Sequence, residues 1–460
     1  MKQHPFVVEI EQAFDAILQR MEDRGVSGRD LMEQLTKRYI EERCLSSGKP
    51  FPTFLKPAFM SPEQFAMVKR VTDSIMKCLE KVSNLYYEDP KYLPLFEMAP
   101  GEIELASVRP PFANKVQHAR LDAFMFGDDL KFCEFNCDTP GGPGYSDIQV
   151  SLLMETEPLK EIQKSYVLER DTFMENVLQG LLACYREYGW DGKGKPRILI
   201  HTLFDLDPTM NELEVLQKYF RNRGYDCVIA QPQDCTFENG SLMVEGAPVE
   251  LVYRRGATTW WISNAKEYTA LWNAYKAGAI CMANPLNSKL AGKKSLMAVL
   301  QSDAMKDKLT DEEKDIVRKH VPWTRIVIDE KTTYDGKPVN LLDFLRENRA
   351  GMVLKPVGLY GGKNVAIGHE MSDRDWLEVL KTAVKERYVA QEYIPIPEIS
   401  LPVYDEKGLH FENKKVNINF FAFNGVYAGG MARVSDSSII NISAGGGLIP
   451  LMAAAKRQLR

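Results

Sequence analysis

The sequence lacks three features, and each absence excludes a common class of protein. It has no uninterrupted apolar run long enough to span a bilayer, and its first residues contain no long apolar core. Its eight cysteines form no CxxC pair and no Cys/His cluster, which argues against structural zinc and a disulfide framework. Its net charge of -5 gives no basic surface for nucleic acid. We therefore expect a cytoplasmic protein whose partners are neither membranes nor nucleic acids.

The composition is that of a globular protein, with 45% hydrophobic and 26% charged residues. A chain of 460 residues is too long for one hydrophobic core, and size statistics predict about two to four domains. Because no long Pro/Gly/Ser linker separates the parts, we expect one compact body with several lobes.

Hydrophobic periodicity predicts a helical N-terminal part followed by an α/β part. Residues 1–95 carry apolar side chains every three or four positions in three segments, at residues 6–21, 28–44 and 62–85. Residues 145–188 are again rich in this pattern. Between residues 195 and 283, apolar strands alternate with helices at residues 209–223, which Gly224 caps, and at 266–277. This order predicts a βαβ unit and a parallel sheet.

The segment from His118 to Asn136 reads as a β-hairpin with a turn at residues 127–129. A period of two places Arg120, Asp122 and Phe124 on one face of the first strand. On the second strand the same period groups Phe132, Glu134 and Asn136, and it turns Cys133 and Cys137 to the opposite face as packing residues.

One face of this hairpin therefore carries two carboxylates, an amide and a guanidinium. Carboxylate and amide oxygens are ligands that suit Mg²⁺, which shares its shell with water and phosphate. The guanidinium of Arg120 would then face a phosphate or a carboxylate. A half-buried hairpin whose polar face is only solvated fits this segment equally well.

A second candidate region begins at Met352 and has the order strand, Gly-rich turn, strand. Lys355 lies inside the apolar first strand, where an unpaired ammonium is costly, so it needs an anionic partner. Backbone N–H groups of the turn at residues 358–362 can approach phosphate oxygens closely. The alternative is an ordinary tight turn.

Two further segments have a binding interpretation and a structural one. Residues 388–397 form a strand end that runs into a Pro-punctuated segment, which can cover an adenine or simply connect two domains. Lys289, Lys293 and Lys294 lie at a helix start, where cations are unfavourable for the helix dipole and suggest an anionic ligand, although a solvated face is the alternative.

Together these residues resemble the circularly permuted ATP-grasp family, and within it the synthetase domain of glutathionylspermidine synthase. The resemblance spans residues 110–445 and rests on five segments of this sequence. They are Arg120-x-Asp122 with Glu134-x-Asn136-x-Asp138-Thr-Pro, the Lys294 helix start, Val353-Leu-Lys355-Pro-Val with Gly361-Gly362-x-Asn364-Val, Gln391-Glu392-Tyr393, and Gly429-Gly-Met-Ala-Arg433. The metal hairpin precedes the nucleotide-binding lysines, which is the order of the permuted family.

The resemblance implies a role for each segment. Asp122, Glu134 and Asn136 would bind Mg²⁺, and Arg120 would stabilise the transferring phosphoryl group and the tetrahedral intermediate. Lys294 and Lys355 would hold the phosphates of ATP. Gly358, Tyr360, Gly361 and Gly362 would close over these phosphates, and Gln391, Glu392, Tyr393 and Ile394 would hold the adenine.

The implied fold is an α/β (α+β), circularly permuted ATP-grasp fold with a Rossmann-like βαβ lobe. Its parts would be an N-terminal helical region at 1–95, the metal-binding hairpin and helices of the core at 96–190, the Rossmann-like lobe at 191–285, the nucleotide-binding lobe and lid at 286–400, and C-terminal strands completing the core at 401–460. The implied activity is ATP-dependent ligation of a small-molecule or peptide carboxylate to an amine through an acylphosphate. A kinase or a non-catalytic ATP-binding protein of the same fold remains an alternative. The sequence does not indicate the acid, the amine or the oligomeric state.

Overall fold

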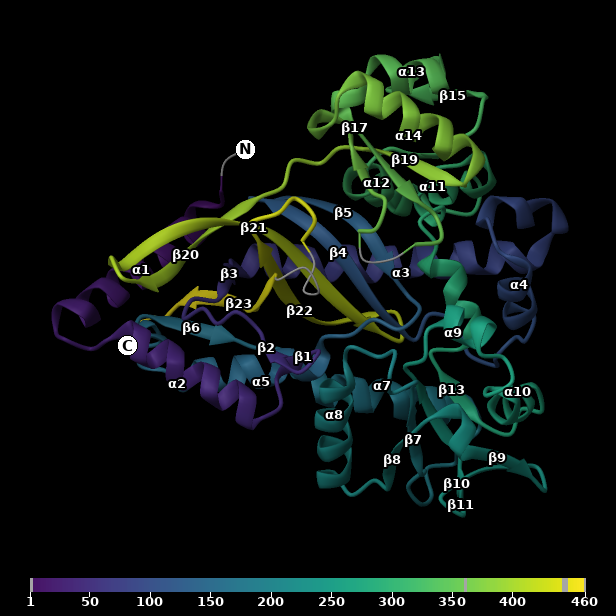
Figure 1. Ribbon diagram of the computed structural model, residues 1–460, viewed down its shortest axis with the longest axis horizontal. Coiled ribbons are helices and arrows are strands. Elements are labelled where there is room, and N and C mark those ends of the chain that lie inside the picture. The colour runs from purple at the N-terminus through teal and green to yellow at the C-terminus, as the bar shows by residue number, and fades with distance from the viewer. Residues whose placement is uncertain (1–2, 360–361, 441–445, 459–460) are drawn as a thin grey trace.

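A large, mostly antiparallel sheet forms the middle of the protein, and two smaller lobes adjoin it (Figure 1). The computed structural model describes residues 3–359, 362–440 and 446–458. In Figure 1 the lobe built on strands β17 and β19 lies above the sheet, and the lobe built on β7, β8 and β13 lies below it. We call them the upper lobe (residues 324–392) and the parallel-sheet lobe (residues 198–283).

The central sheet has eight strands and combines segments from the whole chain. Its main path runs in the order β3 (Ala58–Met60), β23 (Gly447–Lys456), β22 (Val426–Ser435), β21 (Gly408–Phe423), β4 (His118–Phe126) and β5 (Asp129–Asn136). Two strands lie off this path: β20 (Glu398–Asp405) pairs with β21, and β6 (Tyr166–Glu169) pairs with β23. The predicted hairpin is therefore confirmed as β4 and β5, and β21 is its neighbour.

A β-bulge in this hairpin makes the sequence predictions for Phe132 and Cys133 wrong. Asp122 lies opposite Glu134, but the next pair is Ala123 with Phe132, so Cys133 is the extra residue in β5. The bulge breaks the period of two. Phe132 consequently lies in the hydrophobic core and not beside Glu134, and Cys133 lines the cavity described below instead of packing on the opposite face. Cys137 is buried in the core as predicted.

The N-terminal helices lie close to the predicted positions. They are α1 (Pro5–Asp23), α2 (Gly28–Glu41) and α3 (Pro62–Glu88). The side chain of Ser61 accepts from the Gln64 N–H, and that of Gln64 accepts from the Ser61 N–H, so a capping box starts α3 at its predicted residue. The short strand β3 between α2 and α3 joins the central sheet, which the sequence did not predict. Helices α5 (Pro143–Met154), α6 (Glu157–Ile162) and α7 (Phe173–Glu187) follow the hairpin.

The parallel-sheet lobe confirms the predicted βαβ unit. Its sheet has the order β13 (Cys281–Ala283), β12 (Leu251–Arg254), β7 (Ile198–His201), β8 (Cys227–Ala230), and all three strand pairs are parallel. The helices of this lobe are α8 (Met210–Asn222), α9 (Thr258–Ser263) and α10 (Thr269–Lys276). A small antiparallel sheet of β9 (Cys235–Glu238), β10 (Ser241–Val244) and β11 (Ala247–Val249) was not predicted.

The upper lobe is a four-stranded sheet covered by helices. The strands run in the order β14 (Thr324–Ile326), β19 (Tyr388–Glu392), β17 (Met352–Pro356), β18 (Ala366–Ile367), and the helices of this lobe are α13 (Leu341–Glu347) and α14 (Asp373–Lys385). A small hairpin of β15 (Lys331–Tyr334) and β16 (Lys337–Asn340) adjoins them. Strands β17 and β18 pair on either side of the Gly-rich turn, as predicted. Helices α11 (Leu296–Leu300) and α12 (Asp311–His320) precede this lobe, and α4 (Pro100–Ala106) lies between α3 and the hairpin.

No helix in the described part of the chain is long and apolar enough to cross a membrane. The division of the chain at residues 95, 190, 285 and 400 stays a prediction.

Candidate active site

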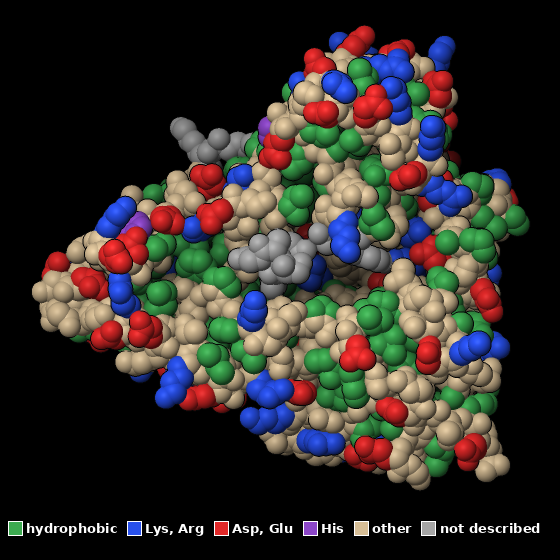
Figure 2. All heavy atoms as spheres, in the orientation of Figure 1, with side chains coloured by type: hydrophobic (Ala, Val, Ile, Leu, Met, Phe, Trp, Pro, Cys, Tyr) green, Lys and Arg blue, Asp and Glu red, His purple; other side chains and the backbone are tan. Residues whose placement is uncertain are grey.

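A cavity of about 310 Å³ lies between the hairpin face of the central sheet and the upper lobe. It brings together most of the site residues predicted from the sequence, which are Arg120, Asp122, Glu134, Asn136, Lys294, Lys355, Gly362, Gln391, Glu392, Tyr393 and Ile394. Gly358 is described but does not line it, and Tyr360 and Gly361 lie outside the described residues. Figure 2 shows Lys and Arg side chains at the centre of this face, between the lobes.

Asp122 lies at the bottom of the cavity between two guanidinium groups. Arg120 Nε is 2.9 Å from Asp122 Oδ1, and Arg433 Nη2 is 2.6 Å from Asp122 Oδ2. Burial of the Asp122 side chain opposes its ionisation, but the two guanidinium groups outweigh that cost and hold its pKa below the usual value. Asp122 is therefore an ionised carboxylate.

Glu134 lies directly across from Asp122 and is paired with a lysine. Register neighbours of this kind have Cβ atoms about 4.5 to 5.5 Å apart, so the two carboxylates share one small region of the sheet face. Lys294 Nζ is 2.9 Å from Glu134 Oε1 and 2.5 Å from the carbonyl oxygen of Leu359 in the Gly-rich turn. Burial opposes ionisation of Glu134, but the Lys294 ammonium outweighs it and keeps the carboxyl pKa lowered.

Asn136 supplies the third polar group of the predicted metal site. It lies opposite Arg120 in the hairpin register, and its amide nitrogen is buried without a hydrogen-bond partner among the described residues. An unsatisfied buried amide is costly unless a ligand completes it. Because rotation of the amide exchanges its nitrogen and oxygen, Asn136 can offer an oxygen to a cation. Two ionised carboxylates and this amide form a donor set that fits Mg²⁺.

Three polar residues beside the carboxylates were missing from the predicted site, and two of them, Asn417 and Arg433, line the cavity. Arg433 donates from Nε to Asn419 Oδ1 at 2.9 Å and from Nη2 to Asn417 Oδ1 at 2.6 Å, while Asn419 donates to Asn417 at 2.7 Å. Asn417 also donates to the Ala123 carbonyl at 2.9 Å. The alternation Asn-x-Asn within an apolar strand was the signal available in the sequence, because polar side chains on one buried strand face need a reason to be there.

Lys355 is half-buried in β17, and its ammonium is held by neutral oxygens. Its ammonium donates to Gln391 Oε1 at 2.6 Å and to the Cys133 carbonyl at 3.0 Å, and no carboxylate of the described residues lies within 4.0 Å of it. Burial lowers the pKa of Lys355 because desolvation disfavours the ammonium. The sequence predicted an anionic partner for Lys355, and no side chain among the described residues is that partner.

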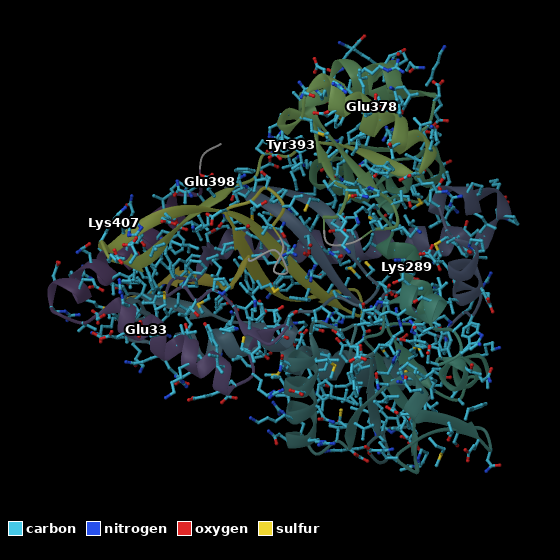
Figure 3. The ribbon with its side chains drawn as sticks, viewed as in Figure 1. Glu33, Lys289, Glu378, Tyr393, Glu398 and Lys407 are labelled. Atoms are coloured by element: carbon cyan, nitrogen blue, oxygen red, sulfur yellow. The ribbon has the colours of Figure 1, made fainter. Side chains whose placement is uncertain are left out.

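The segment Gln391 to Ile394 borders the cavity at its other end. The Glu392 N–H donates to the Trp323 carbonyl, and the Tyr393 N–H donates to the Gly351 carbonyl, both at 2.8 Å. The N–H of Ile394 donates to no acceptor in the described part of the chain. With the apolar side chains of Val353 and Ile367 beside it, this end can accept a flat heterocycle. Figure 3 places Tyr393 where the upper lobe meets the central sheet.

The other lysines of the predicted cluster have a structural role. Lys293 Nζ is 2.7 Å from Glu102 Oε2, and Lys289 Nζ lies 3.9 Å from both Glu102 and Asp138. Both side chains are almost completely buried, so their charges are compensated by carboxylates inside the protein. The prediction of an anionic ligand beside Lys289 and Lys293 is therefore wrong. Of the three lysines in the predicted cluster, only Lys294 lines the cavity.

Asp138 connects the hairpin to the parallel-sheet lobe. Its carboxylate is 2.8 Å from Arg254 Nη1 and accepts hydrogen bonds from the N–H and hydroxyl of Thr258 at 3.0 and 2.7 Å. It does not line the cavity.

Comparison with known proteins gives one family and several similar structures. The profile of the family "circularly permuted ATP-grasp type 2" matches residues 106–435. A glutathione synthetase-like effector from Globodera pallida has a similar structure, with a TM-score of 0.59 and 14% identity over 91% of this chain and 97% of that chain. A putative gamma-glutamylcysteine synthetase from Methylobacillus flagellatus has a TM-score of 0.42 and 11% identity over 83% and 88% of the two chains. No curated protein matches the sequence.

Proposed function

Because the chain belongs to the circularly permuted ATP-grasp type 2 family, we propose that it is an ATP-dependent ligase that joins a carboxylate to an amine and releases ADP and phosphate. The observation that carries this proposal is the composition of one cavity. Its floor combines two carboxylates with two guanidinium groups, its walls carry two lysines, and its far end is apolar. A site for nucleotide binding alone has no need of two arginines beside a metal-binding set of side chains.

One end of the cavity binds the adenine, and the other end binds the phosphates of ATP. The adenine lies against Gln391 to Ile394, with the free N–H of Ile394 as a donor to a ring nitrogen. Lys355 obtains its missing counter-charge from the phosphates, and Lys294 and the backbone of the Gly-rich turn at residues 358–362 contact the same phosphates.

Asp122, Glu134 and Asn136 would hold Mg²⁺, and the cation would supply the positive charge that lets the triphosphate and the carboxylate substrate, both anions, approach each other. Arg120 and Arg433 lie beside these residues at the end of the cavity where charge develops during transfer. Their guanidinium groups bind the equatorial oxygens of the phosphoryl group better in the transition state than in the ground state.

The reaction has two steps. A carboxylate oxygen of the acid attacks the γ-phosphorus, the bond to the β–γ bridging oxygen breaks, and ADP leaves with that electron pair. The amine nitrogen then attacks the acyl carbon, the C–O bond to phosphate breaks, and the amine loses a proton as the amide forms. Arg120 stabilises the oxyanion of the tetrahedral intermediate in the second step.

The substrates proposed first are those of the glutathionylspermidine synthase type, with glutathione or a small peptide as the acid and a polyamine as the amine. The glutathione synthetase-like structure supports a peptide acid only through its similar fold. All eight cysteines are free, which agrees with the proposed cytoplasmic location.

Product analysis tests the proposal. The purified protein is incubated with Mg²⁺ and ATP and with pairs of acids and amines, including glutathione, small peptides, amino acids and polyamines. We expect ADP and phosphate only when both an acid and an amine are present. A stable phosphoester would identify a kinase, and AMP in place of ADP would identify an adenylate route.

An isotope experiment tests the intermediate. With an ¹⁸O-labelled carboxylate substrate, the acylphosphate route transfers one label to the released phosphate. Unlabelled phosphate released together with the amide would exclude this route.

A further inference from the structure

A second cavity shares one wall with the candidate active site. Its volume is about 630 Å³, which is in the range of small-molecule sites in proteins. Glu392, Tyr393 and Ile394 line both cavities, so this short segment separates them. The rest of the second cavity is formed mainly by α11, α12 and the residues around them, where they meet the base of the upper lobe (Figure 1).

The apolar part of the second cavity comes from the hydrophobic core. Leu300, Met305 and Leu309 are buried core residues that also line the cavity. Trp323 and Tyr393 add two aromatic side chains to the lining. A lining of this kind can cover the body of a flat, apolar ligand.

Arg325 is a half-buried cation of this cavity whose described partners are neutral oxygens. These are Thr332 Oγ1 and the Thr324 carbonyl at 2.8 Å, Gln301 Oε1 at 3.3 Å and the Thr333 carbonyl at 3.4 Å. Burial lowers the pKa of Arg325, because the carboxylate of Asp303 only partly compensates the desolvation of the guanidinium. An anionic ligand would supply the missing negative charge.

The other charges of the lining also favour an anion. Five of the lining side chains are cationic, and three are carboxylates. Lys131, Lys314 and Arg318 each form an ion pair with an aspartate. Lys306 and Arg325, in contrast, form no ion pair with a carboxylate in the described part of the chain. These two cations therefore remain available to a ligand.

The guanidinium of Arg325 is held against an aromatic ring. It lies over the indole of Trp323, 5.0 Å from the ring centre. The indole N–H of Trp323 donates to the Thr333 carbonyl at 2.8 Å, which fixes the orientation of the ring. A fixed positive charge thus lies next to an aromatic surface. This combination suits a ligand that has both an anionic group and a flat apolar body.

We propose that the second cavity is a ligand site, separate from the nucleotide cavity, for a small molecule that joins a phosphate or carboxylate group to a flat apolar body. Arg325 and Lys306 bind the anionic group, and Trp323, Tyr393 and the aliphatic core residues cover the body. A ligand bound here also contacts the segment that is proposed to hold adenine. The inference does not depend on the proposed ligation, because it concerns binding to a different cavity.

Calorimetric titration with three naphthalene compounds tests the inference. 1-Naphthyl phosphate and 1-naphthoate share the flat body and differ in the anionic group, whereas 1-naphthol is uncharged at pH 7. For the wild type, we expect at least one of the two anions to bind about tenfold or more tightly than 1-naphthol. The tighter of the two anions identifies the preferred anionic group.

Four variants locate the binding. Arg325→Met should weaken binding of the preferred anion by about tenfold or more and change 1-naphthol binding by less than about threefold. Lys306→Met, at an exposed side chain, should weaken the anion by about threefold. Arg374→Met is the matched control, because Arg374 is an exposed arginine of the upper lobe that does not line the cavity. Lys355→Met alters the nucleotide cavity alone and should bind the anion as the wild type does.

Three results would overturn the inference. In the first, neither anion binds more tightly than 1-naphthol. In the second, folded Arg325→Met and Lys306→Met both bind the anion as tightly as the wild type. In the third, Lys355→Met loses the anion, which would locate the anion in the nucleotide cavity. Circular dichroism and thermal melting show whether each variant is folded, and Lys306→Met decides the second case if Arg325→Met is not.

Discussion

Lys355 carries a half-buried ammonium group whose described partners are neutral oxygens, and this makes it the residue on which nucleotide binding depends most. Its charge is stabilised by Gln391 Oε1 and the Cys133 carbonyl but is not neutralised. Such a group destabilises the empty protein and binds a polyanion strongly, because the ligand supplies the missing charge without a further desolvation cost for the lysine.

Replacing Lys355 by Met should weaken ATP binding by about a hundredfold while the free energy of unfolding at pH 7 changes by less than about 1 kcal/mol. The lost hydrogen bonds offset the removal of the buried charge. Calorimetric titration and urea denaturation measure the two quantities. Unchanged ATP affinity would make Lys355 an ordinary structural lysine, and Lys407→Met, at an exposed lysine that does not line the cavity, is the control.

The lowered pKa of Lys355 also predicts a pH dependence. Between the folded and unfolded pKa values the unfolded chain binds more protons, so this lysine makes stability rise as pH increases from its lowered pKa toward the usual range of lysine. The difference in the free energy of unfolding between wild type and Lys355→Met should therefore move in favour of the wild type across this window. A difference that is constant with pH would contradict the assignment.

Replacing Glu134 by Gln tests the metal site. The substitution keeps the size of the side chain and removes one formal charge, so Mg²⁺-dependent turnover should fall by about a hundredfold or more. The fold should persist, because glutamine keeps the size of the side chain and its amide oxygen can still accept a hydrogen bond from Lys294. Steady-state kinetics over a range of Mg²⁺ concentrations, with thermal melting as the control, gives the answer. Normal Mg²⁺ dependence in a folded variant would remove Glu134 from the metal site.

Replacing Arg120 by Ala separates catalysis from binding. If its guanidinium acts mainly in the transition state, kcat should fall by about two to three orders of magnitude with little change in ATP affinity. Arg120→Lys should not recover the activity, because a point charge cannot replace the planar fork that contacts Asp122. Loss of ATP affinity equal to the loss of kcat would show a role in ground-state binding instead.

At the scale of secondary structure, Gly362 is a position in the described part of the Gly-rich turn where glycine is required. Gly362 has a φ of 75°, and a Cβ built there would lie 2.4 Å from Ile439 Cγ2 in the segment that follows β22. Ser438 in the same segment accepts from Lys415 of the central sheet and donates to Glu370 of the upper lobe, both at 2.6 Å. The turn and this segment therefore meet at the edge of the cavity.

Gly362→Ala should displace the turn from Ile439 and reduce kcat/KM for ATP, with a loss of stability of about 1 kcal/mol. Ile439→Ala in the same protein should recover part of the activity, since it removes the clash but not the strained φ. Gly408→Ala is the control: its φ of 85° gives the same strain in a turn with nothing within 4 Å. Equal kinetics for Gly362→Ala and Gly408→Ala would exclude a role for the turn.

The sequence predictions were accurate for elements that depend on residues nearby in the chain, and they were incomplete where a position depends on distant residues. Helices with local caps, such as α3, and the hairpin from His118 to Asn136 depend on neighbouring residues, and their positions were predicted. Asn417 and Arg433 line the cavity because β21 pairs with β4, almost 300 residues earlier in the chain. The Asn-x-Asn alternation marks a polar strand face, but it does not tell which strand lies beside it. Short strands such as β3 and β6 carry too few residues to show a period.

At the scale of the whole molecule, β23 connects the two ends of the chain. It pairs with β22, with β3 from the N-terminal region and with β6 from the segment after the hairpin. Met452 in this strand is completely buried. The strand thus joins the N-terminal helices to the sheet that carries the site.

Met452→Ala should lower the free energy of unfolding by about 2 to 5 kcal/mol, because a large side chain is deleted from a packed core. Val426→Ala, at a side chain that is 54% exposed, should change it by less than about 0.5 kcal/mol. Urea denaturation monitored by circular dichroism compares the two. A loss below 1 kcal/mol for Met452→Ala would mean that the C-terminal strand is dispensable for stability.

The strand order of the central sheet also bears on how the protein emerges from the ribosome. Strands β4 and β5 leave the exit tunnel before their neighbour β21 and the strands β22 and β23, which follow almost 300 residues later. The parallel-sheet lobe, by contrast, takes all its strands from residues 198–283 and can fold while translation continues. Until β21 has been synthesised, β4 therefore exposes an unpaired, partly apolar edge, and such an edge is a site where another extended segment can pair wrongly.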